Sequence, residues 1–209
     1  MDKKIYFWVD TETTGLDPQN SALLEIAVIV TDSDLEELSR YHAVVKYSAS
    51  EVEEMKAACD TVVLQMHEKT GLWDKLSSRS AIDLQRIDED LSALVPSGSR
   101  PYLAGSSVGF DKGFVTAALP NLSANLHHRV LDVSSIAIMA QTMFQVPAMD
   151  KRREHSALSD IEESISEYRY LVGALASSRP SATRLMFELT DFLRRNPDLG
   201  QRYPDLRVV

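Results

Sequence analysis

The hydrophobic positions follow two different periods along the chain. Residues 5–10, 22–32 and 41–47 are short runs of apolar, β-branched and aromatic residues, a composition that predicts three strands. The loop between the second and third runs is short enough for a hairpin, so we expect these two strands to be antiparallel neighbours. From residue 50 to residue 95 the apolar residues recur with helical spacing, and the stretch PSGSRP ends this region.

Strands and helices alternate in the second half of the chain. Two further strands are predicted over 101–107 and 129–135, and helical patterns cover 109–119, 134–144, 159–176 and 181–196. Three consecutive strands followed by alternating strands and helices predict an α/β fold with a mixed five-stranded sheet flanked by helices. We expect one domain over residues 1–178, with a C-terminal helix and tail (179–209) packed on the same domain.

The composition of the chain restricts the cellular compartment in which we expect the protein. Hydrophobic residues make up 44% of the 209 residues, which suits a globular core, and no window is apolar enough for a membrane span. The first strand begins too early to leave room for a signal peptide, and the single cysteine, Cys59, suits a reducing compartment. These features predict a cytoplasmic protein, or a mitochondrial one if a presequence was removed.

The net charge of -9 limits the class of nucleic-acid partner. Coating long nucleic acid depends on a broad basic surface and counterion release, so no long duplex is expected as a partner. A nuclease for short pieces is compatible with the charge, because bound metal ions can supply positive charge locally. The charge therefore restricts the length of a substrate more than its class.

Four acidic residues stand at the ends of predicted elements. Asp10 and Glu12 are two apart where the first strand stops, so their side chains can point to the same face. Asp111 follows the fourth strand, and Asp160 lies early in a long helix. Taken singly, each is also compatible with a solvated strand end or with an acid favoured by a helix dipole.

His155 precedes Asp160 by five residues. On one continuous helix that spacing would rotate the two side chains about 140° apart, so they converge only if His155 lies before the helix. Ser156 or Ser159 could then cap the helix, and a titrating surface histidine is the alternative interpretation.

Together the four acids and the histidine indicate a metal site, which none of them indicates by itself. Clustered carboxylates repel, and they remain ionised only when cations share them. Oxygen ligands select hard ions such as Mg²⁺ or Mn²⁺. Two such ions about 4 Å apart can stabilise the attacking and leaving oxygens of a phosphoryl displacement, and a neutral imidazole can accept the proton of the attacking water.

Three segments carry a resemblance to a known family. DTETTGL (10–16), GSSVGFD (105–111) and HSALSD (155–160) resemble the three motifs of the DEDDh, or DnaQ-like, 3′–5′ exonucleases. Within that superfamily the chain looks most like the oligoribonucleases. That similarity runs from about Ile5 to about Leu171 and includes residues 8–35, the GSS turn, HHRVLDVSS (127–135) and HSALSDIEESISEYRYL (155–171).

The resemblance implies an RNase H-like exonuclease fold and a set of roles. Two divalent cations, Mg²⁺ or Mn²⁺, would be held by Asp10, Glu12, Asp111 and Asp160, with His155 as the general base. The substrate would be short single-stranded RNA, with short DNA as a further substrate, degraded from the 3′ end to 5′-mononucleotides. Leu16 would wedge against the bases, and Ser107, Arg129 and Ser134 would cap a 5′ phosphate. Arg129 has a planar donor fork that suits phosphate oxygens, and pairing with Asp132 is its alternative.

The chain departs from the family pattern at two substrate-facing positions. Thr13 stands where a Met is usual, and His128 stands where a Tyr from the partner subunit of a homodimer is expected. Homodimerisation is implied by the resemblance alone. Two other functions stay open: a DnaQ-like exonuclease for longer single-stranded DNA or RNA ends, and a catalytically silent nucleic-acid-binding module.

Overall fold

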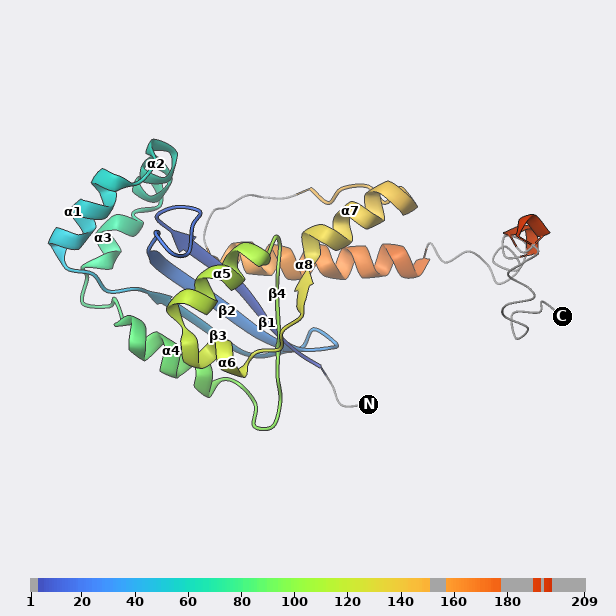
Figure 1. Ribbon diagram of the computed structural model, residues 1–209, viewed down its shortest axis with the longest axis horizontal. Coiled ribbons are helices and arrows are strands. Elements are labelled where there is room, and N and C mark those ends of the chain that lie inside the picture. The colour runs from blue at the N-terminus through green and yellow to red at the C-terminus, as the bar shows by residue number, and fades with distance from the viewer. Residues whose placement is uncertain (1–3, 151–156, 178–189, 193, 197–209) are drawn as a thin grey trace. The chain divides into compact units, whose positions relative to one another are not determined.

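A mixed five-stranded sheet forms the centre of the fold. The computed structural model describes residues 4–150, 157–177, 190–192 and 194–196 (Figure 1). The strands, in the spatial order β3-β2-β1-β4-β5, are β1 (Ile5–Thr13), β2 (Leu23–Asp32), β3 (Glu37–Val44), β4 (Tyr102–Gly105) and β5 (Val130–Asp132). β1, β2 and β3 pair antiparallel, whereas β1, β4 and β5 pair parallel, so the predicted mixed sheet is confirmed.

The hairpin between β2 and β3 is confirmed as well. The Asp32 carboxylate accepts hydrogen bonds from the backbone N–H groups of Asp34 and Glu36 at 2.8 and 3.1 Å. Leu35 adopts a positive φ of 64°, which closes the turn. Because of this tight turn, β3 starts at Glu37, four residues before the predicted strand of residues 41–47.

The helices differ from the predicted ones in two places. Within the region of helical spacing predicted over 50–95, residues 61–76 form two helices instead of one, because Gly71 takes a left-handed conformation (φ 66°) and ends the first. Residues 120–125 form a short helix that the apolar pattern does not predict, with Pro120 at its start. The helices are α1 (Ala49–Ala58), α2 (Thr61–Thr70), α3 (Leu72–Leu76), α4 (Leu84–Ala93), α5 (Gly109–Ala118), α6 (Pro120–Asn125), α7 (Val133–Phe144) and α8 (Ala157–Ser177).

Different helices pack on the two faces of the sheet (Figure 1). Phe7 and Val9 point to one face and join a core with side chains of α4, α5 and α6. The alternate residues of β1 point to the other face, where Trp8 contacts Tyr168 of α8 with ring centroids 5.6 Å apart. This alternation places Asp10 and Glu12 on the face that carries α8, because they follow Trp8 at intervals of two.

The contacts divide the chain into two units, Met1–Leu171 and Val172–Val209. Most of the predicted helix over 181–196 lies outside the described residues, although 190–192 and 194–195 are helical. The packing of residues 179–209 on the main domain stays a prediction. Within the described part of the chain, no helix is long and apolar enough to cross a membrane.

Candidate active site

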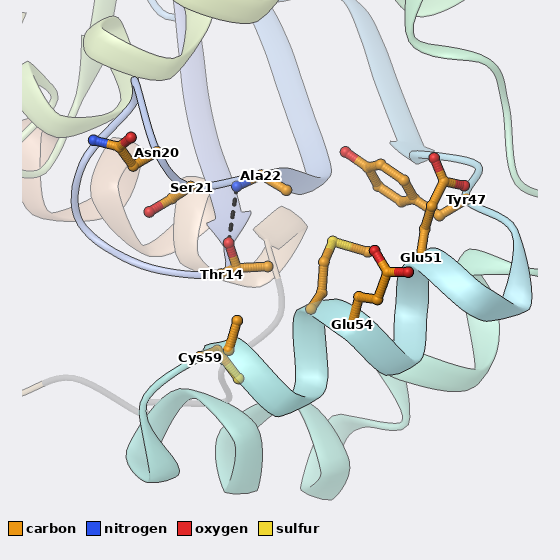
Figure 2. A pocket seen from close by; sticks show the side chains of 10 residues that line it. Thr14, Asn20, Ser21, Ala22, Tyr47, Glu51, Glu54 and Cys59 are labelled. Carbon is orange, nitrogen blue, oxygen red and sulfur yellow. Dashed lines mark hydrogen bonds between the residues drawn. The ribbon is translucent and has the colours of Figure 1, made fainter.

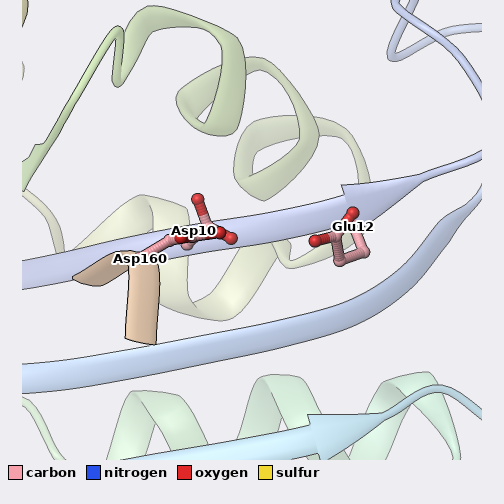
Figure 3. Close-up of side chains that lie close together, drawn as sticks. All are labelled: Asp10, Glu12 and Asp160. Atoms are coloured by element: carbon pink, nitrogen blue, oxygen red, sulfur yellow. The ribbon is translucent and has the colours of Figure 1, made fainter. Parts of the chain in front are cut away.

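Three carboxylates from two elements meet on the α8 face of the sheet. Asp10 and Glu12 extend from β1, and Asp160 extends from the first turn of α8 (Figure 3). One oxygen of each lies within 4.8 Å of the others. Positions two apart on a strand share a face, which explains the first pair, whereas Asp160 is brought in by the packing of α8.

The fourth predicted acid, Asp111, approaches from α5. It is buried, and its Oδ1 accepts a hydrogen bond from the hydroxyl of Thr11 at 2.7 Å. Thr11 stands between Asp10 and Glu12 on β1, so this bond ties the start of α5 to the strand that carries the other acids. Asp111 is close enough for its charge to raise the pKa of Asp10. The structure therefore brings Asp10, Glu12 and Asp160 together, and holds Asp111 beside β1 through Thr11.

Burial and mutual repulsion shift the acidity of these carboxyl groups. Burial, followed by the charges of Asp111, Glu12, Asp160 and Glu25, raises the pKa of Asp10 to about 8. Burial and then Glu25, Asp160 and Asp111 raise the pKa of Glu12 to about 7. Burial also raises the pKa of Asp111 to about 6, although hydrogen bonds from Thr11 oppose this rise. In the metal-free protein the group therefore favours protonated carboxyls, and a cation would reverse that preference.

The donor set suits a divalent metal ion. Each of the three converging residues offers a carboxylate oxygen, and hard cations prefer oxygen ligands. Asp111 supplies a fourth carboxylate beside them. Partial burial and mutual repulsion make such a cluster of ionised carboxylates unfavourable unless positive charge offsets it, so the geometry and the raised pKa values agree.

His155 lies outside the described residues, and its position stays a prediction. The helix that carries Asp160 begins at Ala157, two residues after His155. Ser159 is therefore inside α8 and is not its N-cap, contrary to one of the two predicted starts. Asp160 lies in the first turn of the described part of this helix.

Two residues beside the acids were missed by the sequence analysis. Glu25 of β2 lies directly opposite Glu12 in the antiparallel register, and its Oε1 is hydrogen bonded to Nε2 of His42. An acid inside the apolar run LLEIAVIV was a signal that could have identified it. His67 of α2 is 1% exposed, and its Nε2 donates to the carbonyl of Thr13 at 2.9 Å.

His67 also contacts the acidic cluster. Its Nδ1 lies 3.9 Å from Oε2 of Glu12, and its ring meets the edge of Trp73 with centroids 5.5 Å apart. Burial is the largest influence on its acidity and lowers the pKa of His67. A neutral imidazole with its proton on Nε2 therefore fixes the end of β1 through its hydrogen bond to Thr13. No local pattern in the sequence indicates this contact, since 54 residues separate His67 from Thr13.

The predicted substrate-binding residues fall into two groups. Leu16 is 84% exposed in the turn after β1, whereas Thr13 is buried and its hydroxyl donates to the carbonyl of Gly15 at 2.8 Å. Ser107 and Ser134 approach each other with their hydroxyl oxygens 3.1 Å apart, and Ser107 has a positive φ of 54°. The structure thus joins the two serines that were predicted together, from the turn after β4 and the start of α7.

His128 and Arg129 lie in the exposed segment before β5. The His128 ring stacks on that of His127 with centroids 4.3 Å apart. The backbone N–H of Arg129 donates to Nδ1 of His127 at 3.0 Å, and Arg129 is exposed. Asp132, the predicted alternative partner of Arg129, accepts a hydrogen bond from the N–H of Ser135 and caps α7.

A hollow of about 450 Å³ lies beside the turn that follows β1 (Figure 2). Thr14 lines it and accepts a hydrogen bond from the N–H of Ala22 at 2.8 Å. Glu51 and Glu54 of α1 also line it, together with Tyr47 and Cys59. The two carboxylates make this hollow a poor place for a phosphate group.

Comparison with known proteins assigns the class. Residues 7–168 match the family model RNase_T, described as exonuclease, and this range contains all four predicted acids and all of the sheet except the first two residues of β1. Fold and site therefore define a member of the RNase T class of exonucleases.

Individual relatives identify the family within this class to which the chain belongs. The chain is 37% identical to the oligoribonuclease of Mannheimia succiniciproducens over 81% of this chain and 92% of the relative, and 37% identical to that of Tropheryma whipplei over 78% and 89%. It is 33% identical to a probable oligoribonuclease of Schizosaccharomyces pombe over 80% and 67%. The chain belongs to the oligoribonuclease family.

Solved structures support the fold. The chain superimposes on exonuclease I of Methylocaldum szegediense with a TM-score of 0.62 and 17% identity, over 88% of this chain and 43% of the other. A product-bound exonuclease I gives a TM-score of 0.64 and 12% identity, over 90% and 46%. The chain therefore spans less than half of these exonuclease I chains, and the likeness confirms the RNase H-like exonuclease fold.

Proposed function

We propose that this protein is a metal-dependent 3′–5′ exoribonuclease that hydrolyses very short RNA oligonucleotides to 5′-mononucleotides. The observation that carries the proposal is the convergence of Asp10, Glu12 and Asp160 within 4.8 Å in a chain of the oligoribonuclease family. The relatives carry the name oligoribonuclease, and the present chain has all four acids of the motif that gives the superfamily its name.

Asp10, Glu12, Asp111 and Asp160 would hold two divalent cations, Mg²⁺ or Mn²⁺. When bound, such ions stabilise the attacking and leaving oxygens of an in-line phosphoryl displacement. The support for this assignment is the oxygen-only donor set and the raised pKa values of Asp10, Glu12 and Asp111, which reflect burial and, for Asp10 and Glu12, repulsion by neighbouring carboxylates.

The remaining roles are those of the general base and of the substrate-binding residues. His155 would accept the proton of the attacking water, since the unperturbed pKa of an imidazole lies near 6.5. Leu16, which is 84% exposed, would contact the terminal base. Ser107, Ser134 and Arg129 would bind the 5′ phosphate, and the 3.1 Å contact between the two hydroxyls supports a shared role for the serines.

The preference for short substrates follows from charge. With 31 acidic and 22 basic residues, the chain lacks the broad positive surface that long nucleic acid requires. A phosphate cap at the 5′ end would also limit the length of RNA that fits between the cap and the metal site. We therefore expect activity to fall as the substrate lengthens.

A length series tests this function. We would incubate 5′-labelled RNA of two to seven nucleotides with the protein and Mg²⁺ or Mn²⁺, and measure release of 5′-mononucleotides. We expect RNA of two nucleotides to be hydrolysed fastest, and the Asp10→Asn variant to release no mononucleotides. Rates that hold or rise with length would instead favour the DnaQ-like exonuclease for longer ends, and the same oligonucleotides made of DNA would measure the sugar preference.

We also propose that the protein is a homodimer. The support is an exposed apolar face on α7, where Ile138, Met139, Met143 and Phe144 are between 39% and 74% exposed. Light scattering after size exclusion would measure the mass in solution. Ile138→Glu should convert a dimer to a monomer if this face is the interface, whereas Val62→Glu, at a similarly exposed residue of α2, should leave the mass unchanged.

A further inference from the structure

A second hollow, of about 270 Å³, lies among β4, α5, α6 and the segment before β5. Its polar lining is Arg100, Lys112, Thr116, Ser123, His127 and His128, over a floor of three apolar side chains. Among the described residues no carboxylate lines it, neither one of the four predicted acids nor any other. In a chain with 31 acidic and 22 basic residues, such a lining is unusual and favours an anionic ligand.

The two cations of this hollow retain unused donors. Arg100 donates from one terminal nitrogen to the carbonyl of Ala124 at 2.9 Å, and Lys112 donates to the carbonyl of His128 at 2.8 Å. Neither forms an ion pair with a carboxylate of the described residues. A guanidinium has five donor hydrogens and an ammonium three, so both can bind an anion while keeping these bonds. The backbone contacts hold them at the rim of the hollow.

Three aromatic rings stack beside this hollow, and two of them, those of His127 and His128, line it. Tyr102 stacks on His127 with centroids 4.4 Å apart, and His127 stacks on His128 at 4.3 Å. Backbone contacts fix the middle ring: the His127 N–H donates to the carbonyl of Pro101 at 2.8 Å, and Nδ1 accepts from the N–H of Arg129. His128, at the end of the stack, is exposed. Its free face can therefore accept a further flat ring.

Positive charge is concentrated around this stack. Burial, followed by the charges of His128, Arg129, Arg100 and Lys4, lowers the pKa of His127. Like charges at this density repel one another, and a bound anion would offset that repulsion. The hydroxyls of Thr116 and Ser123 could donate to the same anion, since both line the hollow.

We propose that this hollow binds a nucleoside monophosphate. The phosphate would lie between Arg100 and Lys112, and the base would stack on His128. Arg is suited to the paired oxygens of a phosphate, and bases stack readily on aromatic side chains. A volume of about 270 Å³ is at the small end of ligand sites, so it accommodates one nucleotide rather than an oligonucleotide. This site does not depend on the metal cluster or on the proposed hydrolysis.

Calorimetry on the full chain in EDTA tests the proposal. Without divalent ions the acidic cluster repels phosphates, and an Arg129→Gln background removes the cation of the proposed 5′-phosphate cap, so binding of adenosine 5′-monophosphate reports on the basic hollow. The double variant Arg100→Gln, Lys112→Gln should weaken that binding by about tenfold or more, because each change removes a charge-assisted hydrogen bond. The control Arg86→Gln, Lys75→Gln removes the same charge from α4 and α3 and should change the affinity by less than about twofold.

Three ligands separate the contributions. Adenosine 5′-monophosphate should bind more tightly than adenosine, which lacks the phosphate, and more tightly than inorganic phosphate, which lacks the base. Equal affinity for inorganic phosphate would overturn the nucleotide assignment, and equal affinity for adenosine would overturn the role of the cations. Equal weakening in the control double variant would overturn the site itself. Unchanged melting temperatures of both double variants, together with amide shifts of Lys112 and His127 on ligand addition, would establish that folding does not explain the loss.

Discussion

At the scale of single residues, like charge sets the properties of the acidic cluster. Asp10 is surrounded by Asp111, Glu12, Asp160 and Glu25, and its pKa is raised to about 8. In the folded, metal-free protein its ionised form is therefore less stable than in the unfolded chain. Glu12 has the same direction of shift for the same reasons. The residues that would bind metal are thus residues that destabilise the metal-free fold.

Replacing Asp10 should therefore stabilise the protein while removing activity. In EDTA at pH 8, Asp10→Asn should raise the melting temperature by about 2–4 °C, the shift expected for about 1 kcal/mol in a domain of this size. The advantage should vanish near pH 4, where the carboxyl is largely protonated in the folded protein. Differential scanning calorimetry measures both, and a variant that melts below the parent at pH 8 would contradict the prediction.

The buried imidazole of His67 permits a different prediction. His67→Leu leaves the carbonyl of Thr13 without its buried donor, a loss that typically costs about 1–3 kcal/mol. We expect the free energy of unfolding, measured in urea, to fall by that amount. His67→Gln, which can still donate a hydrogen bond, should recover part of the loss. If both variants were equally stable, the bond to Thr13 would not be important for stability.

At the scale of elements, close contacts between residues of different elements determine how the strands and helices pack. Gly105 ends β4, and an added Cβ would lie 2.9 Å from the carbonyl oxygen of Val9 on β1. The parallel pairing of these strands brings the start of α5 and Asp111 towards β1. On the other face, Arg40 of β3 contacts Glu162 of α8 at 3.1 Å, two residues from Asp160. Short contacts between elements thus position two of the four acids.

Gly105→Ala should separate β4 from β1. The backbone oxygen of Val9 cannot turn aside, so we expect a loss of about 1–3 kcal/mol, the usual cost of overpacking. Gly109→Ala is the matched control, because its Cβ would meet no atom within 4 Å and alanine favours helix at the start of α5. Chemical denaturation of both variants measures the difference. Equal stability of the two would show that the strands can adjust.

At the scale of the whole molecule, the shifted acids couple folding to pH and metal. The pKa values of Asp10, Glu12 and Asp111 are raised to about 8, 7 and 6, whereas the same groups titrate near 4 in an unfolded chain. Between about pH 4 and pH 8 the folded protein binds more protons than the unfolded one. Stability of the metal-free protein should therefore fall as the pH rises through this range.

A divalent cation should reverse this trend. Metal binding requires deprotonated carboxylates, so Mg²⁺ or Mn²⁺ should raise the melting temperature more at pH 8 than at pH 5. Thermal melts over pH 4–9, with EDTA or with metal in excess, measure the effect. Calcium-free buffers and the Asp10→Asn variant serve as controls. An identical metal-induced shift at pH 5 and pH 8 would contradict the coupling.

The local patterns of the sequence were sufficient for most of the fold and for part of the site. Alternating and helical periods predicted five strands and most helices, because those periods record which side chains are buried. The end of α2 at Gly71 and the helix that starts at Pro120 were not predicted. The first depends on a residue in the left-handed conformation, and the second is a helix of only 6 residues. The start of β3 depended on the turn around Leu35 rather than on hydrophobicity.

By itself the sequence determined that Asp10 and Glu12 share a face, because the period of a strand is two residues, and that the chain has the motifs of an exonuclease family. The tertiary structure alone decided that α8 brings Asp160 to them and that Glu25 and His67 stand beside Glu12. It also decided that Arg100, Lys112 and two stacked histidines surround one hollow. Such contacts join residues far apart in the chain, and packing between elements, rather than local spacing, determines their distances.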